Sequence, residues 1–314
     1  MANASMVPMQ EFKAKVGIFM PYYNMDEYID EALDSLYSQT FNDFTVIIAD
    51  DASPSKKTVK KLSGIHFPRC QIYFEKKNLG LIRISNKYMA KIDAEYIMLF
   101  SPDDKMHPDL LKEEVEYLDS HPNVHAVCTN IQEFGDGNQV IEYDDESCKL
   151  PHMLIENRFS GAALVRKSAW LAAGMHDTNK DLYPNLDYDL WLSMLEKGFA
   201  LGTIPKTLFY WRVVKKSLSH NVNSSQILTF RKALLRKYSA LYKEHAEYTI
   251  GRYLEIVSKF ESYYATSEEG HDWLDNQYHS LIDENASLRE HLDDSIQRPY
   301  VRSAYHRLHS HFKK

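Results

Sequence analysis

Two pairs of acidic residues each follow an apolar, β-branched run, and this repeated arrangement most constrains the fold. One pair, Asp50 and Asp51, comes directly after residues 44–49, and the second pair begins at Asp103, shortly after residues 96–100. Such runs are typical of strands that are buried on both faces of a parallel sheet. Ligands of open α/β sheets bind beyond the carboxyl ends of these strands, so we expect both acid pairs to face one crevice.

The crowding of these carboxylates has a chemical consequence. Carboxylates at one crevice repel each other unless a cation or hydrogen-bond donors compensate their charge. Carboxylate oxygens are also the ligands that hard divalent cations prefer. The arrangement therefore predicts a divalent metal, Mn²⁺ or Mg²⁺, together with a hydroxyl-rich, phosphorylated ligand.

Strand and helix signals alternate along much of the chain in the manner of βαβ units. The predicted strands span residues 16–20, 44–49, 71–74, 96–100, 124–128, 140–143 and 162–165. Predicted helices cover residues 27–39, 81–92 and 187–197, and others begin at Ser53 and Pro108. Residues 144–159 and 174–185 lack periodicity, and we expect them to form loops over the mouth of the sheet. The fold class is α/β, with a mixed, mainly parallel sheet flanked by helices.

Composition limits the class of protein. The 314 residues are 44% hydrophobic and 26% charged, as in a soluble globular protein, and the net charge of −7 gives no reason to expect nucleic acid as a partner. No segment approaches the ~18 apolar residues of a membrane span, and the N-terminus lacks a signal-peptide core. The three cysteines lack the spacing of a zinc or redox motif. We therefore predict a cytoplasmic protein with reduced thiols.

Seven short motifs occur in an order that resembles the family 2 glycosyltransferases of GT-A fold. They are Pro21-Tyr-Tyr23-Asn24, Ser38-Gln39-Thr40-Phe41, Asp50-Asp51-Ala-Ser53, Asn78-Leu-Gly80, Ser101-Pro-Asp103-Asp104, Pro108-Asp109 and Asp187-Tyr-Asp-Leu-Trp191. The resemblance implies inverting sugar transfer from a nucleotide diphosphate sugar to an acceptor hydroxyl. It also implies a tail at 1–14, a GT-A domain at 15–223 and a helical C-terminal region at 224–314.

For the donor nucleotide, the resemblance implies that Pro21 and Tyr23 flank the base. Asp51 would accept a hydrogen bond from N3–H of uracil or thymine, which favours UDP- or dTDP-sugars because cytosine lacks that donor. Arg83 is a candidate for approach to the diphosphate. The structural alternatives are a partly buried core ring for Tyr23 and an exposed or ion-paired Arg83.

The leaving diphosphate develops negative charge, which a divalent cation stabilises. The resemblance makes Asp104 the expected metal ligand and Asp103 the expected contact to the ribose or to the outer shell of the metal. Ser101 stands where the commonest family pattern, Asp-x-Asp-Asp, has its first acid, so fewer carboxylates remain for the ion. A helix-capping turn before Pro108 is the structural alternative for this pair.

An inverting displacement also needs a general base for the acceptor hydroxyl. Asp187 aligns with the aspartate of the family's Glu-Asp pair, and Leu186 replaces the glutamate. Asp189 is the alternative base, although on a helix it would point elsewhere. The resemblance also makes Arg212 and His220 candidates for contact with the diphosphate.

The region after residue 223 reads as a helical appendage. Apolar residues and one asparagine are spaced by four and three, as in the seam of a short coiled coil: Leu274, Tyr278, Leu281, Asn285, Leu288 and Leu292. This seam predicts a homo-oligomer, and the alternative is an amphipathic helix packed within the chain. The acid-free segment from Arg298 to Lys314 is basic, and it is either a peripheral contact with the inner face of the membrane or a solvated terminus.

Together these features predict a metal-dependent glycosyltransferase that binds a nucleotide-sugar donor and extends a glycan acceptor, as in surface polysaccharide synthesis. Two other classes remain open. A catalytically silent nucleotide-sugar-binding or scaffolding protein would explain Ser101, Leu186 and the Val214 that replaces a family histidine. A sugar-1-phosphate nucleotidyltransferase would need a glycine-rich basic loop after the first strand, and Pro21-Tyr-Tyr-Asn24 has no such glycines.

Overall fold

The computed structural model describes residues 13–183, 185–214 and 223–266. The chain divides into two compact units, Met1–Thr249 and Ile250–Lys314. Within the described residues, no helix combines the length and the apolar character that crossing a bilayer requires. His220, the predicted seam from Leu274 to Leu292 and the basic segment from Arg298 lie outside the described residues.

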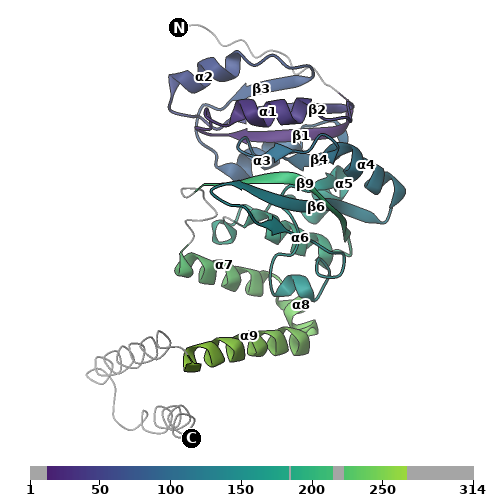
Figure 1. Ribbon diagram of the computed structural model, residues 1–314, viewed down its shortest axis with the longest axis vertical. Coiled ribbons are helices and arrows are strands. Elements are labelled where there is room, and N and C mark those ends of the chain that lie inside the picture. The colour runs from purple at the N-terminus through teal and green to yellow at the C-terminus, as the bar shows by residue number, and fades with distance from the viewer. Residues whose placement is uncertain (1–12, 184, 215–222, 267–314) are drawn as a thin grey trace, which may run out of the picture. The chain divides into compact units, whose positions relative to one another are not determined.

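One mixed sheet runs through the first unit (Figure 1). Its strand order is β3-β2-β1-β4-β8-β6-β9-β5, with β7 paired to β6. The strands are β1 (Ala14–Tyr22), β2 (Phe44–Asp50), β3 (Cys70–Phe74), β4 (Ala94–Leu99), β5 (Lys105–Met106), β6 (Val124–Gly135), β7 (Val140–Ile141), β8 (Leu164–Arg166) and β9 (Ala200–Val213).

The pairing of these strands determines where the acid pairs lie. Strands β3, β2, β1 and β4 run parallel, so their carboxyl ends share one edge of the sheet. Strand β8 is antiparallel to both β4 and β6, and β6 is parallel to β9. Asp51 follows β2 and Asp104 follows β4, so both residues lie at the shared edge.

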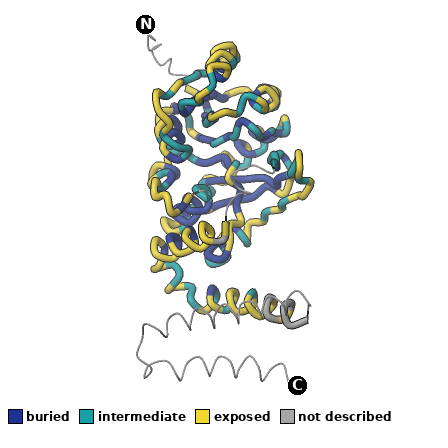
Figure 2. Tube along the Cα trace, turned by 90° about the vertical axis from the view of Figure 1, so that its left-hand side faces the viewer, coloured by how far each residue is buried: buried dark blue, intermediate teal, exposed yellow. Residues whose placement is uncertain are grey.

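Helices α1 to α6 cover both faces of the sheet. The helices of the described residues are α1 (Ile29–Tyr37), α2 (Lys56–Ser63), α3 (Leu81–Met89), α4 (Leu110–Ser120), α5 (Lys167–Ala173), α6 (Leu186–Glu196), α7 (Ser224–Lys237), α8 (Ser239–Glu244) and α9 (Ala246–Thr266), with short 3₁₀ turns η1 (His152–Leu154) and η2 (Lys180–Leu182). Alternate residues of β1 serve the two faces: Ile18 joins the core under α1, α2 and α4, and Phe19 joins the core under α3, α5 and α6. Strand β2 is accordingly buried at every position, and Figure 2 shows long buried stretches, in dark blue, inside the first unit.

The predicted mixed sheet flanked by helices, with a helical C-terminal region, is confirmed. Several boundaries differ from the sequence prediction. Strand β1 continues through Pro21 to Tyr22, and α2 begins after Ser55, whose hydroxyl accepts from the backbone N–H of Lys57 at 3.1 Å. The predicted strands 124–128 and 140–143 are expected to form a hairpin, but β7 pairs with the later part of β6, at Ile131, because Ala126 and Val127 in the first part pair with β8.

The start of the helical region is marked by a capping box. The side chain of Asn223 accepts from the backbone of Gln226, and the side chain of Gln226 accepts from the backbone of Asn223. The compact first unit continues beyond this point to Thr249, so α7 and α8 belong to the same unit as the sheet. All three cysteines are free thiols, as predicted.

Candidate active site

The turn after β4 and the first turn of α6 meet at a cavity of about 380 Å³. Asp104 and Asp187 both line this cavity, although one follows strand β4 and the other lies in helix α6. Ser101, Asn157 and Gly161 line it as well. The structure thus brings together the expected metal ligand and the expected general base.

Asp104 is buried and has little to compensate its charge. The backbone N–H of Arg212 donates to its Oδ1 at 2.9 Å, and its own N–H donates to the carbonyl of Ser101, which closes the turn. Burial raises the pKa of Asp104 well above its usual value, the neighbouring Asp103 raises it further, and the Arg212 N–H partly opposes this. A buried carboxylate with so few donors around it needs a positive charge nearby to stay ionised.

The acid pair has the chemistry of a hard-cation site. Burial also raises the pKa of Asp103, and the Ser101 hydroxyl opposes part of that rise. Among the described residues, no group of three or more His, Cys, Asp or Glu could hold a metal by itself. Two under-compensated carboxylates fit an ion whose remaining ligands are diphosphate oxygens and water, because Mn²⁺ and Mg²⁺ are commonly bound by one or two carboxylates plus phosphates.

Arg212 is held against the turn that carries the acids. Its Nε donates to the carbonyl of Asp103 at 2.8 Å, and its guanidinium forms an ion pair with Glu31. The same group lies over the rings of Phe134 and Tyr28, at 4.3 and 4.7 Å from their centroids. These contacts fix the side chain beside the acid pair, and whether it also reaches a diphosphate stays a prediction.

Asp187 lies in the first turn of α6, and a loop covers one of its oxygens. The amide of Asn157 donates to Oδ2 at 2.9 Å. A Cβ at Gly161 would lie 3.3 Å from the same oxygen, so a glycine allows the loop to approach this closely. Burial raises the pKa of Asp187, and the Asn157 hydrogen bond opposes part of the rise. Sequence reasoning missed Asn157 and Gly161, because the loop that carries them has no periodic signal.

Asp189, the alternative base, does not line the cavity. It is 1% exposed and both of its oxygens lie 2.8 Å from Nζ of Lys237 on α7, while the hydroxyl of Tyr238 donates to it at 2.8 Å. Burial raises the pKa of Asp189, and Lys237 opposes that rise. Lys237 also pairs with Asp177, so α7 is joined to α6 and to the loop before η2.

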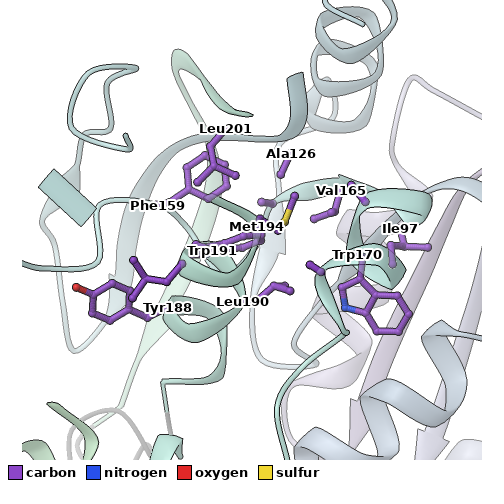
Figure 3. Packing of buried hydrophobic residues seen from close by; sticks show 14 of the residues in the cluster. Ile97, Ala126, Phe159, Val165, Trp170, Tyr188, Leu190, Trp191, Met194 and Leu201 are labelled. Atoms are coloured by element: carbon purple, nitrogen blue, oxygen red, sulfur yellow. The ribbon is translucent and has the colours of Figure 1, made fainter. Parts of the chain in front are cut away.

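Helix α6 is also fixed by aromatic packing on its inner side. Trp191 meets the ring of Phe159 edge to face, with centroids 4.9 Å apart, and Figure 3 shows both rings in the cluster with Leu190 and Met194. Phe159 lies between Asn157 and Gly161 in sequence, so its burial fixes the loop that contacts Asp187. The core thus holds both partners of the Asp187 contact.

Asp51 lies at the same edge of the sheet but does not line the cavity. Its two oxygens accept from the backbone N–H groups of Leu79 and Gly80 at 2.7 and 2.8 Å, which holds the loop before α3. Each carboxylate oxygen keeps a second lone pair that can accept one more donor. The structure therefore gives Asp51 a loop-holding role in addition to the nucleotide contact that stays a prediction.

The other expected nucleotide contacts lie near this loop. Tyr23 is 45% exposed, so it is not a core ring. The N–H of Asn24 donates to the Ser53 hydroxyl at 3.0 Å, which joins the loop after β1, and with it Pro21, to the loop after β2. Arg83 is exposed on α3 and forms no ion pair with any residue that the structure describes.

Residues 17–180, just over half of the chain, match the family model described as Glycosyl transferase family 2. The chain belongs to this family. The glycosyltransferase is 26% identical to the amylovoran biosynthesis glycosyltransferase AmsE of Erwinia amylovora, over 72% of this chain and 88% of that protein. It is 23% identical to TuaG of Bacillus subtilis, which is named for teichuronic acid biosynthesis, over 68% of this chain and 84% of that protein.

Solved structures share the fold of this glycosyltransferase. S. aureus TarS in complex with UDP-GlcNAc superposes with a TM-score of 0.56 at 16% identity, over 67% of this chain and 61% of that chain. The mannosyltransferase PcManGT from Pyrobaculum calidifontis, in complex with GDP-Man and Mn²⁺, gives a TM-score of 0.50 at 14% identity, over 90% of this chain and 89% of that chain. At these identities the likeness shows the GT-A fold alone.

Proposed function

We propose that this family 2 member is a metal-dependent, inverting glycosyltransferase that moves a sugar from a UDP- or dTDP-sugar to a hydroxyl of a glycan acceptor. The observation that carries the proposal is the placement of Asp104 and Asp187 on one cavity, with their carboxylates contributed by the turn after β4 and the start of α6. In an inverting displacement, the group that stabilises the leaving diphosphate and the general base lie on opposite sides of the reacting carbon. A single cavity lined by both Asp104 and Asp187 supports that arrangement.

In this proposal Asp187 accepts the proton of the acceptor hydroxyl. A base works best when its pKa lies near the operating pH, and burial raises the pKa of Asp187 in that direction. The Asn157 amide donates to Oδ2, and this contact orients the carboxylate towards the cavity. Leu186 also lines the cavity, so an apolar side chain stands beside the base where the family resemblance would place a glutamate.

Asp104, with Asp103 beside it, would hold the divalent cation. When bound, such an ion stabilises the negative charge of the leaving diphosphate. Arg212 keeps the acid turn in place through its backbone N–H and its Nε. Pro21, Tyr23 and Asp51 would hold the base, and Arg83 lies exposed where it is free to approach the phosphates.

We also propose that the glycan belongs to a surface polysaccharide and that the enzyme works in the cytoplasm. The names of AmsE and TuaG, amylovoran and teichuronic acid biosynthesis, support the first point for this chain. Oligomerisation through the predicted seam and membrane contact by the basic terminal segment stay predictions, because both fall outside the described residues.

The test is nucleotide release from a panel of UDP- and dTDP-sugars, measured with and without Mn²⁺. We expect release only with the metal, and we expect Asp187→Asn to lower the turnover roughly 10²- to 10⁴-fold, the usual contribution of a general base. Binding of the nucleotide should be unchanged in this variant. Asp181→Asn is the matched control, because Asp181 is an exposed acid that does not line the cavity.

Four outcomes would contradict the proposal. Turnover that needs no metal would remove the role of Asp104, and turnover that survives Asp187→Asn would remove the base. Nucleotide-sugar binding without any release, across the whole panel, would instead favour a silent binding protein. Pyrophosphate release from UTP and a sugar-1-phosphate would favour a nucleotidyltransferase.

A further inference from the structure

One stretch of this acidic protein is strongly basic. Residues 52–92 contain ten lysines and arginines and a single acid, Glu75, whereas the whole chain has a net charge of −7. The stretch runs from the end of β2 through α2 and β3 to the end of α3. A local field of this kind attracts anionic partners even when the total charge is negative.

Part of this positive charge is already paired within the protein. Lys61 pairs with Asp30, Arg69 with Asp43, and Lys87 with Glu75. Six other lysines are exposed and form no ion pair with any described residue, and five of them lie on α2 or directly after β3: Lys56, Lys57, Lys60, Lys76 and Lys77. These five lysines therefore present uncompensated charge to solvent.

Four of the five lysines lie at one end of the sheet, and the fifth, Lys60, lies one turn further along α2. Strand β3 is an edge strand, and α2 packs against it, as Figure 1 shows. Lys56 and Lys57 open α2 just after the carboxyl end of β2, and Lys76 and Lys77 follow the carboxyl end of β3. Because these strands are parallel neighbours, the two lysine pairs lie at the same end. We call this surface, with Lys60, Val59 and Phe74, the basic edge.

The basic edge also exposes two apolar side chains. Val59 of α2 is 43% exposed and Phe74 at the end of β3 is 41% exposed. Exposed lysines on the same elements as exposed valine and phenylalanine side chains match the composition of surfaces that lie on a bilayer, where cations meet anionic headgroups and apolar groups enter the acyl boundary. A water-soluble polyanion would leave the two apolar side chains without a partner.

The basic edge does not line the cavity that holds Asp104 and Asp187. The residues that line the 380 Å³ cavity include no lysine or arginine, and none of them comes from α2 or β3. We propose that the basic edge docks this glycosyltransferase on a membrane surface that carries acidic phospholipids. This docking is independent of the transfer reaction, so either proposal can fail alone.

The experiment is co-sedimentation of the full chain with vesicles. One set is phosphatidylcholine, and in the other about a third of the lipid is phosphatidylglycerol. We expect binding to the anionic vesicles only, and release as NaCl shortens the screening length. The test variant carries Lys→Gln at the five lysines of the basic edge. At about fivefold in affinity per cation at an anionic surface, it should lose at least about 100-fold.

A matched control removes the same charge elsewhere. It carries Lys→Gln at five exposed lysines outside the basic edge: Lys13, Lys112, Lys180, Lys232 and Lys243. We expect this control to keep its affinity within about threefold of the wild type, since charges beyond a Debye length are screened. Circular dichroism and UDP binding confirm that each variant is folded.

A second variant tests the apolar part of the surface. Val59→Ser together with Phe74→Ser keeps every lysine, so binding at low salt should weaken less than in the lysine variant and should become more sensitive to NaCl. Polyphosphate chains serve as the soluble competitor. They should displace the protein only at charge concentrations well above those of the lipid.

Several results would overturn the docking surface. The lysine variant could bind vesicles as the wild type does. Alternatively, the control could lose as much affinity as the lysine variant, which would mean that binding depends on the net charge of the protein and not on the basic edge. Loss of binding on Lys→Gln and Arg→Gln changes in the terminal segment alone, at Arg302, Arg307, Lys313 and Lys314, would assign the membrane contact to that segment. Binding to polyphosphate with no binding to vesicles would point to a soluble polyanion instead.

Discussion

Asp51 and Asp104 follow the same kind of apolar strand, yet their carboxylates have opposite surroundings. Asp51 receives two backbone N–H groups, from Leu79 and Gly80, and holds a loop. Asp104 receives only the N–H of Arg212 among the described residues, is buried, and has a raised pKa. The fold therefore places an acid that follows a strand at the edge of the sheet. The hydrogen-bond donors around its carboxylate then decide whether it holds a loop of the protein or is left to bind a ligand.

Replacing Asp104 should have the largest effect on turnover and little effect on stability. Asp104→Asn removes the charge that would hold the cation, so we expect nucleotide release to fall at least about 100-fold, as when an electrostatic contact to the reacting groups is lost. The free energy of unfolding should stay equal or rise, because a neutral amide costs less to bury than a carboxylate. Release assays and urea denaturation measure the two quantities on one preparation.

Two results would remove the contrast between the acids. Release that stays within about threefold of wild type, or unfolding at clearly lower urea, would make Asp104 a structural residue like Asp51. Asp181→Asn is again the matched control, because it removes an exposed charge that does not line the cavity.

Replacing Asp51 should show the opposite profile. Asp51→Asn leaves one amide oxygen to accept where two carboxylate oxygens accepted, so one backbone N–H of the loop before α3 loses its partner. We expect about 1.5–3 kcal/mol lower stability, the usual range for hydrogen bonds to a charged group. Urea denaturation measures it, and hydrogen exchange at Leu79 and Gly80 should accelerate. An unchanged unfolding midpoint would show that the loop is held by other contacts.

Glu114 tests whether burial alone makes an acid functional. It lies in α4, is 0% exposed, has no hydrogen-bond partner among the described residues, and does not line the cavity. Burial raises its pKa well above the usual 4.5. The native state therefore keeps a proton that the unfolded chain loses, so stability falls as the pH rises from 4.5 towards the raised native value.

Glu114→Gln should abolish this slope. We expect the variant to match the wild type below pH 4.5, where both states hold the proton, and to exceed it by about 1–2 kcal/mol near pH 7. Turnover should not change at either pH. Parallel pH profiles for the two proteins would mean that Glu114 finds a partner in solution, and a loss of turnover would tie α4 to the site.

The sequence predicted an element well where continuous burial gives an unbroken run of apolar residues. Strand β2 is buried at every position, so its apolar run could be recognised directly. Strand β9 was missed, because Pro205 and exposed polar residues such as Lys206 interrupt its pattern. Its role depends on pairing with β6 and β5, and pairing between distant segments leaves no local signal.

The same reasoning explains what was predicted of the site. Asp104 follows a strand and Asp187 begins a helix, and both elements have strong local signals; the structure places both acids on one cavity. Asn157 meets Asp187 from a position 30 residues earlier in the chain, and no spacing rule connects them. Asp51 was expected at the same crevice, but its oxygens turn to the loop before α3, which depends on the positive φ of +82° at Gly80.

The backbone bond from Arg212 to Asp104 joins positions 108 residues apart in the chain. During synthesis, strands β1 to β4 therefore leave the ribosome long before the segment that steadies Asp104 exists. Until β9 has been made, the acidic turn lacks the tether that gives it a fixed shape. The proposed cation site is therefore completed later in synthesis than the parallel half of the sheet.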